Sequence, residues 1–217
     1  MANFNEVFSV RSERLSVSLI AALESRHFEA YYCPTKTDAL NKALSLIAPK
    51  TSVCWGGSET IGEIGLIDEL RKRDQNVLLD VDKPNSKEER EQVKRNGFFA
   101  DNFLMSSNAI TEDGQLVNVD GFGNRVASLI FGPKSVIVVA GMNKVCADLE
   151  SAISRARHYA APLNSTRLEI QGTPCMATGK CCDCKSPNCI CAQIVITRFC
   201  KGDRRIKVIL VGQSLGY

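Results

Sequence analysis

Residues 135–144 have the sequence Ser-Val-Ile-Val-Val-Ala-Gly-Met-Asn-Lys and give the clearest indication of the architecture. The segment from Ser135 to Ala140 is the most apolar strand-like segment of the chain, as expected of a central strand that is buried on both faces of a parallel sheet. Gly141-Met142-Asn143-Lys144 then leaves the strand and is expected to begin the next helix. The carboxyl end of such a strand borders the crevice in which open α/β sheets bind ligands. Asn143 and Lys144 are therefore candidate ligand-binding residues, and the alternative is a helix-initiating turn with a solvated lysine.

Strand-like and helix-like segments alternate on both sides of this run. Short apolar segments predict strands, and apolar residues three or four positions apart predict helices. The expected strands are 29–33, 51–55, 76–81, 99–106 and 115–119, and the expected helices lie within 1–30, from 35 to 49, and at 61–70, 86–95, 125–131 and 145–160. This alternation predicts an α/β fold with a mainly parallel sheet and helices on both faces.

The C-terminal part of the sequence has a different character. Residues 192–199 and 205–211 are strand-like, and Lys201-Gly202-Asp203 between them is a turn signal, so a β-hairpin is predicted there. A cysteine-rich loop comes directly before it. We therefore expect an α/β domain over residues 1–170 and an appendage over residues 171–217 that carries the loop and the hairpin.

Composition and charge exclude several classes of protein. The 217 residues are 44% hydrophobic and 24% charged, which excludes a disordered or coiled-coil chain. The net charge of +3 is small and evenly spread, so no nucleic-acid partner is expected. The longest apolar run is far shorter than the roughly 20 residues of a membrane span. The first six residues show neither a basic nor an apolar signal-peptide region, so a cytoplasmic protein is expected.

Seven of the ten cysteines lie between Cys175 and Cys200, and such clustered thiols more often bind a metal than form disulfides in a reducing compartment. Taking one cysteine from each group gives the candidate ligand set Cys175-x5-Cys181-x2-Cys184-x6-Cys191. Four thiolates suit either an iron–sulfur cluster or a structural zinc ion. A zinc ribbon usually has two C-x2-C pairs and this loop has one, which favours the iron–sulfur cluster. Cys182 and Cys189 are left over, and free thiols without a metal are the remaining alternative.

Two further glycine-rich turns carry polar side chains. Gly56-Gly57-Ser58-Glu59-Thr60 follows a predicted strand, and its backbone and hydroxyl groups suit an anion, although a helix N-cap at Ser58 explains it equally well. Asp120-Gly121-Phe122-Gly123-Asn124-Arg125 offers a guanidinium for a carboxylate or phosphate, and the alternative is a surface ion pair of Arg125 with an aspartate. No catalytic residue is assigned. The candidates for acid–base chemistry are Asp113, Asp120 and Lys144.

Two long motifs of this chain resemble the lactate-utilisation (LUD) domain family, in its cysteine-bearing subgroup. The first is Ser107-Asn108-Ala109-Ile110-Thr111-Glu112-Asp113-Gly114 continuing through Asp120-Gly121-Phe122-Gly123-Asn124-Arg125, and the second is Thr173-Pro174-Cys175 with the cysteines that follow. The resemblance implies a fold like the sugar-phosphate isomerase/CoA-transferase group. The candidate ligand-binding residues that it carries over, together with the turns above, are Gly56, Gly57, Ser58, Thr60, Asn108, Asn124, Arg125, Asn143 and Lys144.

The resemblance also implies a role in the oxidation of L-lactate to pyruvate alongside iron–sulfur proteins. Our hypothesis is a redox component of hydroxyacid oxidation with a cysteine-ligated iron–sulfur centre, of the 4Fe–4S type, and a pocket for a small carboxylate or phosphorylated ligand. The expected partners are iron–sulfur or flavin oxidoreductase subunits, and a homo-oligomer is left open. The alternatives are an isomerase- or transferase-type enzyme with a structural zinc site and a non-enzymatic assembly partner of an iron–sulfur oxidoreductase.

Overall fold

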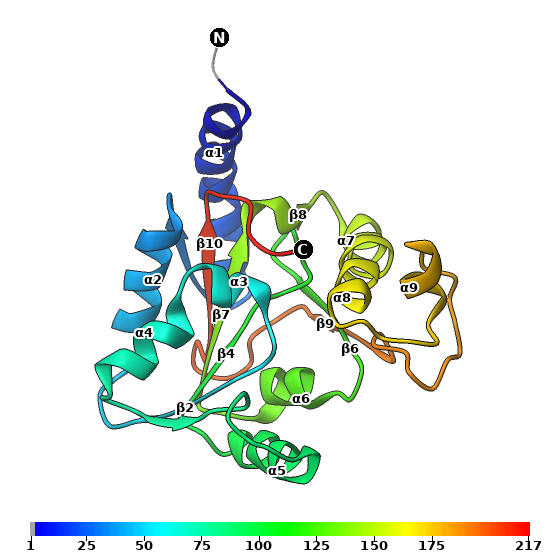
Figure 1. The fold of residues 1–217 in the computed structure, drawn as a ribbon. Helices are drawn as coiled ribbons and strands as arrows, with labels where there is room; N and C mark the ends of the chain where they lie inside the picture. The colour runs from blue at the N-terminus through cyan, green and yellow to red at the C-terminus, as the bar shows by residue number, and fades with distance from the viewer. Residues whose placement is uncertain (1–2) are drawn as a thin grey trace.

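A six-stranded parallel sheet forms the centre of the computed structural model, which describes residues 3–217 (Figure 1). Met1 and Ala2, which belong to the segment examined for a signal peptide, lie outside the described residues. The strand order is β1 (Glu29–Cys33), β10 (Ile206–Val211), β7 (Ser135–Gly141), β4 (Asn102–Met105), β2 (Ser52–Trp55) and β3 (Val77–Leu79). All neighbouring pairs are parallel. The predicted central strand is confirmed, because β7 lies inside the sheet and Val136 to Ala140 are fully buried.

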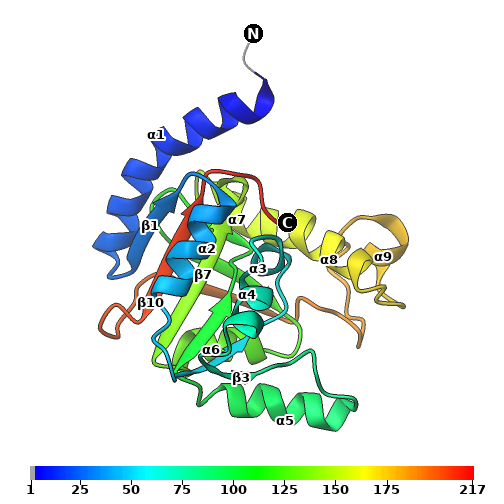
Figure 2. The same ribbon diagram turned by 60° about the vertical axis from the view of Figure 1, so that its left-hand side comes forward.

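Helices cover both faces of this sheet, as predicted. One face carries α2 (Lys36–Ser45), α3 (Glu59–Glu63) and α4 (Leu66–Arg73), and the opposite face carries α5 (Lys87–Gly97) and α6 (Asn124–Phe131) (Figures 1 and 2). Capping side chains fix several of the helix starts. Thr35 and Asp38 form a capping box at α2, and Ser86 caps α5. The first helix, α1 (Phe4–Ser25), contacts β1, and its N-terminal half extends away from the body of the molecule (Figure 2).

A second, four-stranded sheet lies beside the first one. Its order is β8 (Val145–Cys146), β5 (Ala109–Thr111), β6 (Leu116–Asp120) and β9 (Gln193–Thr197). The predicted turn at residues 111–114 joins β5 to β6, with Gly114 at φ +87°, a conformation that glycine adopts without strain. The alanines of α7 (Leu149–Arg155) and of the turn after it pack on this sheet in a small separate core.

The predicted C-terminal hairpin is wrong. The two strands belong to different sheets: β9 pairs with β6, and β10 lies between β1 and β7. The burial of the two strands explains the difference. Val208 to Val211 are buried on both faces, as interior strands of parallel sheets are, whereas every residue of β9 is at least partly exposed. Residues 206–211 therefore complete the main sheet rather than an appendage of residues 171–217.

The helix predicted at 145–160 also does not end where expected, before Ala161 and Pro162. The helical path continues from α7 through a π-helical turn (Ala156–Ala160) into α8 (Ala161–Arg167). Pro162 lies in the first turn of α8, where a missing N–H group is tolerated. The cysteine-rich loop follows, with one short helix, α9 (Pro174–Thr178). Within residues 3–217, no helix is both long and apolar enough to cross a membrane.

Candidate functional site

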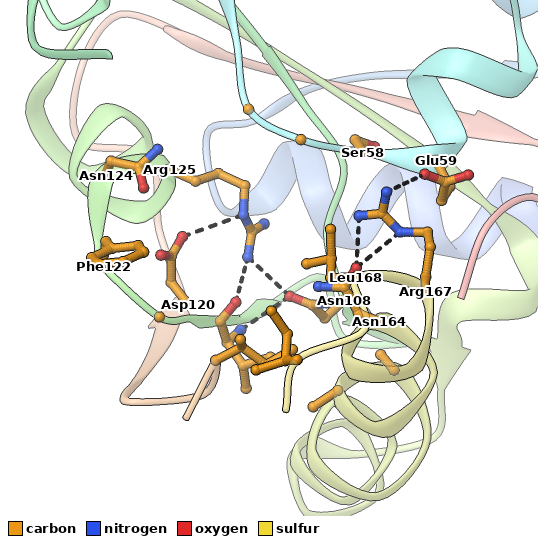
Figure 3. Close-up of a pocket in the computed structure, with 18 of the residues that line it drawn as sticks. Ser58, Glu59, Asn108, Asp120, Phe122, Asn124, Arg125, Asn164, Arg167 and Leu168 are labelled. Atoms are coloured by element: carbon orange, nitrogen blue, oxygen red, sulfur yellow. Dashed lines mark hydrogen bonds and ion pairs between the residues drawn. The ribbon is translucent and has the colours of Figure 1, made fainter. Parts of the chain in front are cut away.

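A cavity of about 880 Å³ opens at the carboxyl ends of the central strands (Figure 3). Its walls come from the segments that follow β2, β4 and β7, from the loop after β6, from α8 and from the loop that precedes β9. The helix after β2 lies on one face of the sheet and the helix after β4 lies on the other. The cavity therefore lies at a topological switch point, where the connections that leave two neighbouring strands run over opposite faces of the sheet. Open α/β sheets bind ligands at such points.

The structure brings together most of the predicted site residues and leaves out two. The residues that line the cavity are Gly56, Gly57, Ser58, Thr60, Asn108, Asp120, Asn124, Arg125 and Lys144. Asn143 does not line the cavity, and its side-chain amide is instead hydrogen-bonded to the backbone of Leu215 and Gly216. Asp113 lies at the β5–β6 turn, where it forms an ion pair with Arg26 at 2.5 Å, and a hydrogen bond from Thr111 lowers the pKa of its carboxyl group.

Lys144 is buried, with 3% of its surface exposed, at the end of a single 3-10 turn (Met142–Lys144) directly after β7. This turn leads into β8, so the predicted helix does not begin there. The Lys144 Nζ atom donates to Thr60 Oγ1 at 2.8 Å and to Ser106 Oγ at 3.0 Å. Burial is the largest cause that lowers the pKa of Lys144 to about 7, followed by the charges of Arg155 and Arg125. The lysine is therefore not the solvated side chain of the alternative interpretation.

Arg125 is held by the protein itself. Its Nη1 atom donates to Ser106 O at 3.1 Å and to Asn118 Oδ1 at 2.7 Å, and its Nη2 atom donates to Asn108 Oδ1 at 3.1 Å and to Val119 O at 2.5 Å. The remaining nitrogen, Nε, lies 3.4 Å from Asp120 Oδ2. Because all five N–H groups face protein acceptors, Arg125 positions the surrounding loops and has no donor left for a ligand in this arrangement.

The glycine-rich turn after β2 forms a further part of the cavity wall. Ser58 Oγ accepts a hydrogen bond from Ile61 N at 3.4 Å, so Ser58 is the N-cap of α3, as in the alternative interpretation. Glu59 forms an ion pair with Arg167 of α8 at 2.8 Å, and Arg167 also donates to Asn164 Oδ1 at 2.8 Å. Figure 3 shows Glu59, Arg167 and Asn164 on one side of the cavity, and Arg125, Asp120 and Asn108 beside them.

Sequence reasoning missed several polar residues at or beside the cavity, among them Lys94, Ser106, Arg155 and Arg167. Ser106 accepts from Lys144 and directly follows β4, so the general rule that strand ends line the crevice could have found it. Arg155 donates to Asn143 O at 3.2 Å and to Asn108 O at 2.6 Å from α7, and Arg167 comes from α8. Nothing in the local sequence distinguishes these two arginines from ordinary surface arginines of an amphipathic helix.

The six cysteines of the loop line a second cavity, of about 170 Å³. They are Cys175, Cys181, Cys182, Cys184, Cys189 and Cys191. The Sγ atoms of Cys189 and Cys191 lie 3.4 Å apart, and burial, followed by the hydrogen bond with Cys189, raises the pKa of Cys191 to about 12. Cys200 is buried away from this group and accompanies the hydrophobic core.

The donor set of this thiol cavity suits a soft metal centre, because thiolates are the ligands that zinc and iron–sulfur clusters prefer. The side-chain positions are less favourable. Among residues 3–217, no three His, Cys, Asp or Glu side chains are placed close enough together to hold a metal ion. Gathering the ligands of one centre therefore requires the thiol side chains to turn toward the cavity that they share.

The two cavities have a common wall. Ala161, Cys189 and Ile190 line both of them. The backbone of Ile190 also packs closely on Gly121, since a Cβ atom at Gly121 would lie 3.3 Å from Ile190 Cα. The cysteine loop and the loop after β6 are therefore in direct contact beside the larger cavity.

Comparisons with known proteins give a family and a fold. A family model described as "LUD domain" matches residues 18–211. The crystal structure of a DUF162 family protein from Deinococcus radiodurans aligns with a TM-score of 0.54 and 11% identity over 92% of this chain and 98% of that chain. A search of curated proteins finds no match.

Two structures from Chaetomium thermophilum are more distant. eIF2B delta aligns with a TM-score of 0.34 and 17% identity over 51% of this chain and 48% of that chain. The tetrameric eIF2B-beta2-delta2 complex aligns with a TM-score of 0.39 and 14% identity over 91% of this chain and 58% of that chain. Neither similarity is high enough to support an argument about this protein.

Proposed function

The chain belongs to the LUD domain family, and from this premise we propose that it is a cytoplasmic redox component of L-lactate or related hydroxyacid oxidation. In this proposal the thiol cavity holds an iron–sulfur centre, and the larger cavity binds a small carboxylate or phosphorylated ligand. Iron–sulfur or flavin oxidoreductase subunits are the partners. The observation that carries the proposal is that six cysteines line one cavity that shares a wall with the larger one.

The centre, when bound, would supply one-electron transfer beside the ligand. The residues that would hold it are Cys175, Cys181, Cys184 and Cys191, with Cys182 and Cys189 in the same cavity. Hydrogen bonds from Ser186 Oγ to Gly172 O at 2.9 Å and from Asn188 Nδ2 to Gln171 O at 3.0 Å fix the base of the loop.

Further contacts of the loop support this assignment. An ion pair between Asp183 and Arg157 ties the loop to the π-helical turn. The shared wall of Ala161 and Ile190 would separate the centre from water in the larger cavity. These contacts hold the loop against the body of the molecule, so that ligand and centre would lie on opposite sides of one thin wall.

The ligand would meet groups other than Arg125, whose donors are already used. Lys94 and the side chain of Asn124 line the larger cavity and would bind the ligand's anionic oxygens. Charge-assisted hydrogen bonds of this kind fix a small anion in a defined orientation. Asp120 and Glu59 are engaged in ion pairs with Arg125 and Arg167, which reduces their repulsion of an anion.

Metal analysis of protein purified without oxygen tests the proposal. We expect iron and acid-labile sulfide in equal amounts, together with broad visible absorbance, and we expect the loss of all three in Cys181→Ser/Cys184→Ser. Cys146→Ser is the matched control, because Cys146 is partly buried but lines neither cavity. Colourless protein with stoichiometric zinc and no sulfide would contradict electron transfer.

One observation favours a second candidate, an isomerase- or transferase-type enzyme whose cysteines hold a structural zinc ion. Lys144 is a buried amine at a ligand-sized cavity, and such amines serve acid–base and nucleophilic chemistry. This candidate predicts stoichiometric zinc and no sulfide in the same metal analysis, together with a reactive Lys144 in the larger cavity.

A further inference from the structure

Lys144 is a buried amine without an acidic partner. Among residues 3–217 it takes part in no ion pair within 4.0 Å, and its hydrogen-bond partners are the neutral hydroxyl groups of Thr60 and Ser106. Burying an unpaired ammonium group is so costly that such a group usually loses its proton instead. The geometry therefore favours the uncharged amine.

The charged groups around Lys144 act mainly in the same direction. Arg155 from α7 and Arg125 from α6 both lower the pKa of Lys144, and Glu63 from α3 is the opposing charge. Burial is a larger cause than any of them, and the resulting pKa is about 7. Roughly half of the Lys144 side chains are then uncharged at neutral pH, against about one in two thousand for an exposed lysine with an ordinary pKa near 10.4.

The hydrogen bonds of the uncharged amine leave its lone pair free. Thr60 Oγ1 and Ser106 Oγ lie within donating distance of backbone carbonyl groups, Leu215 O at 3.5 Å and Ser107 O at 3.3 Å. Both oxygens therefore accept from Lys144 Nζ. An uncharged amine has two hydrogens, which these two hydroxyl groups take up, so the lone pair has no partner among residues 3–217.

We propose that Lys144 is a nucleophile that forms an imine with the carbonyl carbon of a small 2-oxo acid bound in the 880 Å³ cavity. The C–N bond forms as the amine attacks, the amine protons pass to the former carbonyl oxygen, and this oxygen leaves as water. No electrons are gained or lost overall. The proposal rests on the part of the proposed function that assigns a small carboxylate to this cavity, and it is independent of the metal centre.

The substrate class follows from the cavity. An imine-forming site needs an amine nucleophile and groups that hold the rest of the molecule in place. Lys94 and Asn124 line the same cavity and supply a cationic and an amide group for the carboxylate. The hydroxyl groups of Thr60 and Ser106 remain beside the nitrogen, where they can pass protons to and from the departing oxygen.

Reductive trapping tests the assignment. Folded wild-type protein is treated briefly at pH 7 with glyoxylate and cyanoborohydride, and peptide mapping by mass spectrometry gives the rate of carboxymethylation at each lysine. We expect Lys144 to react at least about tenfold faster than the exposed Lys87, because about half of the Lys144 amines are uncharged near its pKa of about 7 and lie beside the groups that hold the carboxylate. The matched variants are Lys144→Met, which should lose this fast phase, and Lys87→Met, which should retain fast modification of Lys144 because Lys87 is exposed and lines neither cavity.

Two results would overturn the proposal: modification of Lys144 no faster than of Lys87 in folded wild-type protein, or a fast phase that persists in Lys144→Met. The outcome is separable from the proposed function. Protein that contains no iron but is trapped rapidly at Lys144 refutes the redox role and supports the nucleophile. Protein that contains iron and sulfide but is not trapped at Lys144 supports the redox role and refutes the nucleophile.

Discussion

The reactivity of the site depends on what surrounds individual side chains, and Lys144 is the clearest case. Its amine is buried at a strand end between two hydroxyl groups, with two arginines nearby and no carboxylate of the described residues 3–217 in contact with it. Neither the sequence position after an apolar strand nor the residue type distinguishes this environment from that of a solvated lysine. The same environment that makes the amine reactive must also reduce the stability of the fold, because the protonated form is disfavoured in the folded state.

We predict that Lys144 makes stability rise with pH. The pKa of Lys144 is about 7 in the folded protein and near 10.4 in the unfolded chain, so the unfolded chain binds more protons between these values. The free energy of unfolding of the wild type, relative to Lys144→Met, should therefore increase by up to about 1.4 kcal/mol per pH unit from pH 7 toward pH 10 and stay flat below pH 7. Urea unfolding of both proteins at several pH values measures this difference. A constant difference would mean that the folded-state pKa is ordinary.

Arg125 and Arg167 both line the cavity, but we predict unequal effects on stability. Arg125→Met leaves the Asp120 carboxylate, which is 8% exposed, buried without its counter-ion and removes four hydrogen bonds. The expected loss is about 3–5 kcal/mol. Arg167→Met is the matched control, since its ion pair with Glu59 is more than one-third exposed on both sides and contributes less than about 1 kcal/mol. Thermal or urea unfolding compares them, and equal losses would contradict the positioning role of Arg125.

At the level of strands and helices, the local pattern predicted most elements and failed where pairing depends on distant parts of the chain. β7 was predicted because five consecutive buried apolar residues have no other common explanation than a two-faced strand. The two C-terminal strands were assigned to each other because they are adjacent in sequence. β10 instead pairs with β1 and β7, which are distant in sequence, and the local sequence of β10 does not indicate these partners. The π-helical turn before Pro162 is likewise invisible to a rule that ends helices at proline.

The location of the site could be predicted from the sequence, but the roles of its side chains could not. Turns that directly follow strands of the main sheet were found, because parallel strands bring their carboxyl ends to one edge. The use of each side chain was not predictable. Arg125 was expected to bind the ligand, but its donors are directed by the packing of β4, β6 and the loop between β6 and α6 to protein acceptors.

We predict that a substitution in β10 is far more damaging than one in β9. Leu210 of β10 is fully buried between β1 and β7, and Leu210→Ala should lower the free energy of unfolding by about 2–5 kcal/mol. Ile196 of β9 is 39% exposed, so Ile196→Ala should cost less than about 1 kcal/mol. Urea unfolding of the two variants gives the comparison. Similar costs would support a hairpin in which the two strands are equivalent partners.

At the level of the whole molecule, the shared wall links the thiol cavity to the larger one. Ile190 lines both, and its backbone packs on Gly121 in the loop that also carries Asn124. The approach is close, because a Cβ atom at position 121 would lie 3.3 Å from Ile190 Cα, so that the two segments would have to shift slightly to accept a side chain there. Ordering of the cysteine loop by a bound metal should therefore restrict the motion of the loop after β6 as well.

We predict that removal of the metal proposed for the thiol cavity speeds amide hydrogen exchange at two separate places. Exchange should rise in residues 181–191, which lose their ligand-imposed order, and also in residues 120–124, which pack on that segment. Residues 29–45, in β1 and α2, serve as the internal control, since none of them lines either cavity. In Gly121→Ala the added methyl group loosens this contact, so the metal-dependent difference in exchange at residues 120–124 should become smaller. Mass spectrometry of metal-loaded and chelator-treated protein measures all three regions. A response confined to residues 181–191 would mean that the two cavities are neighbours without being coupled.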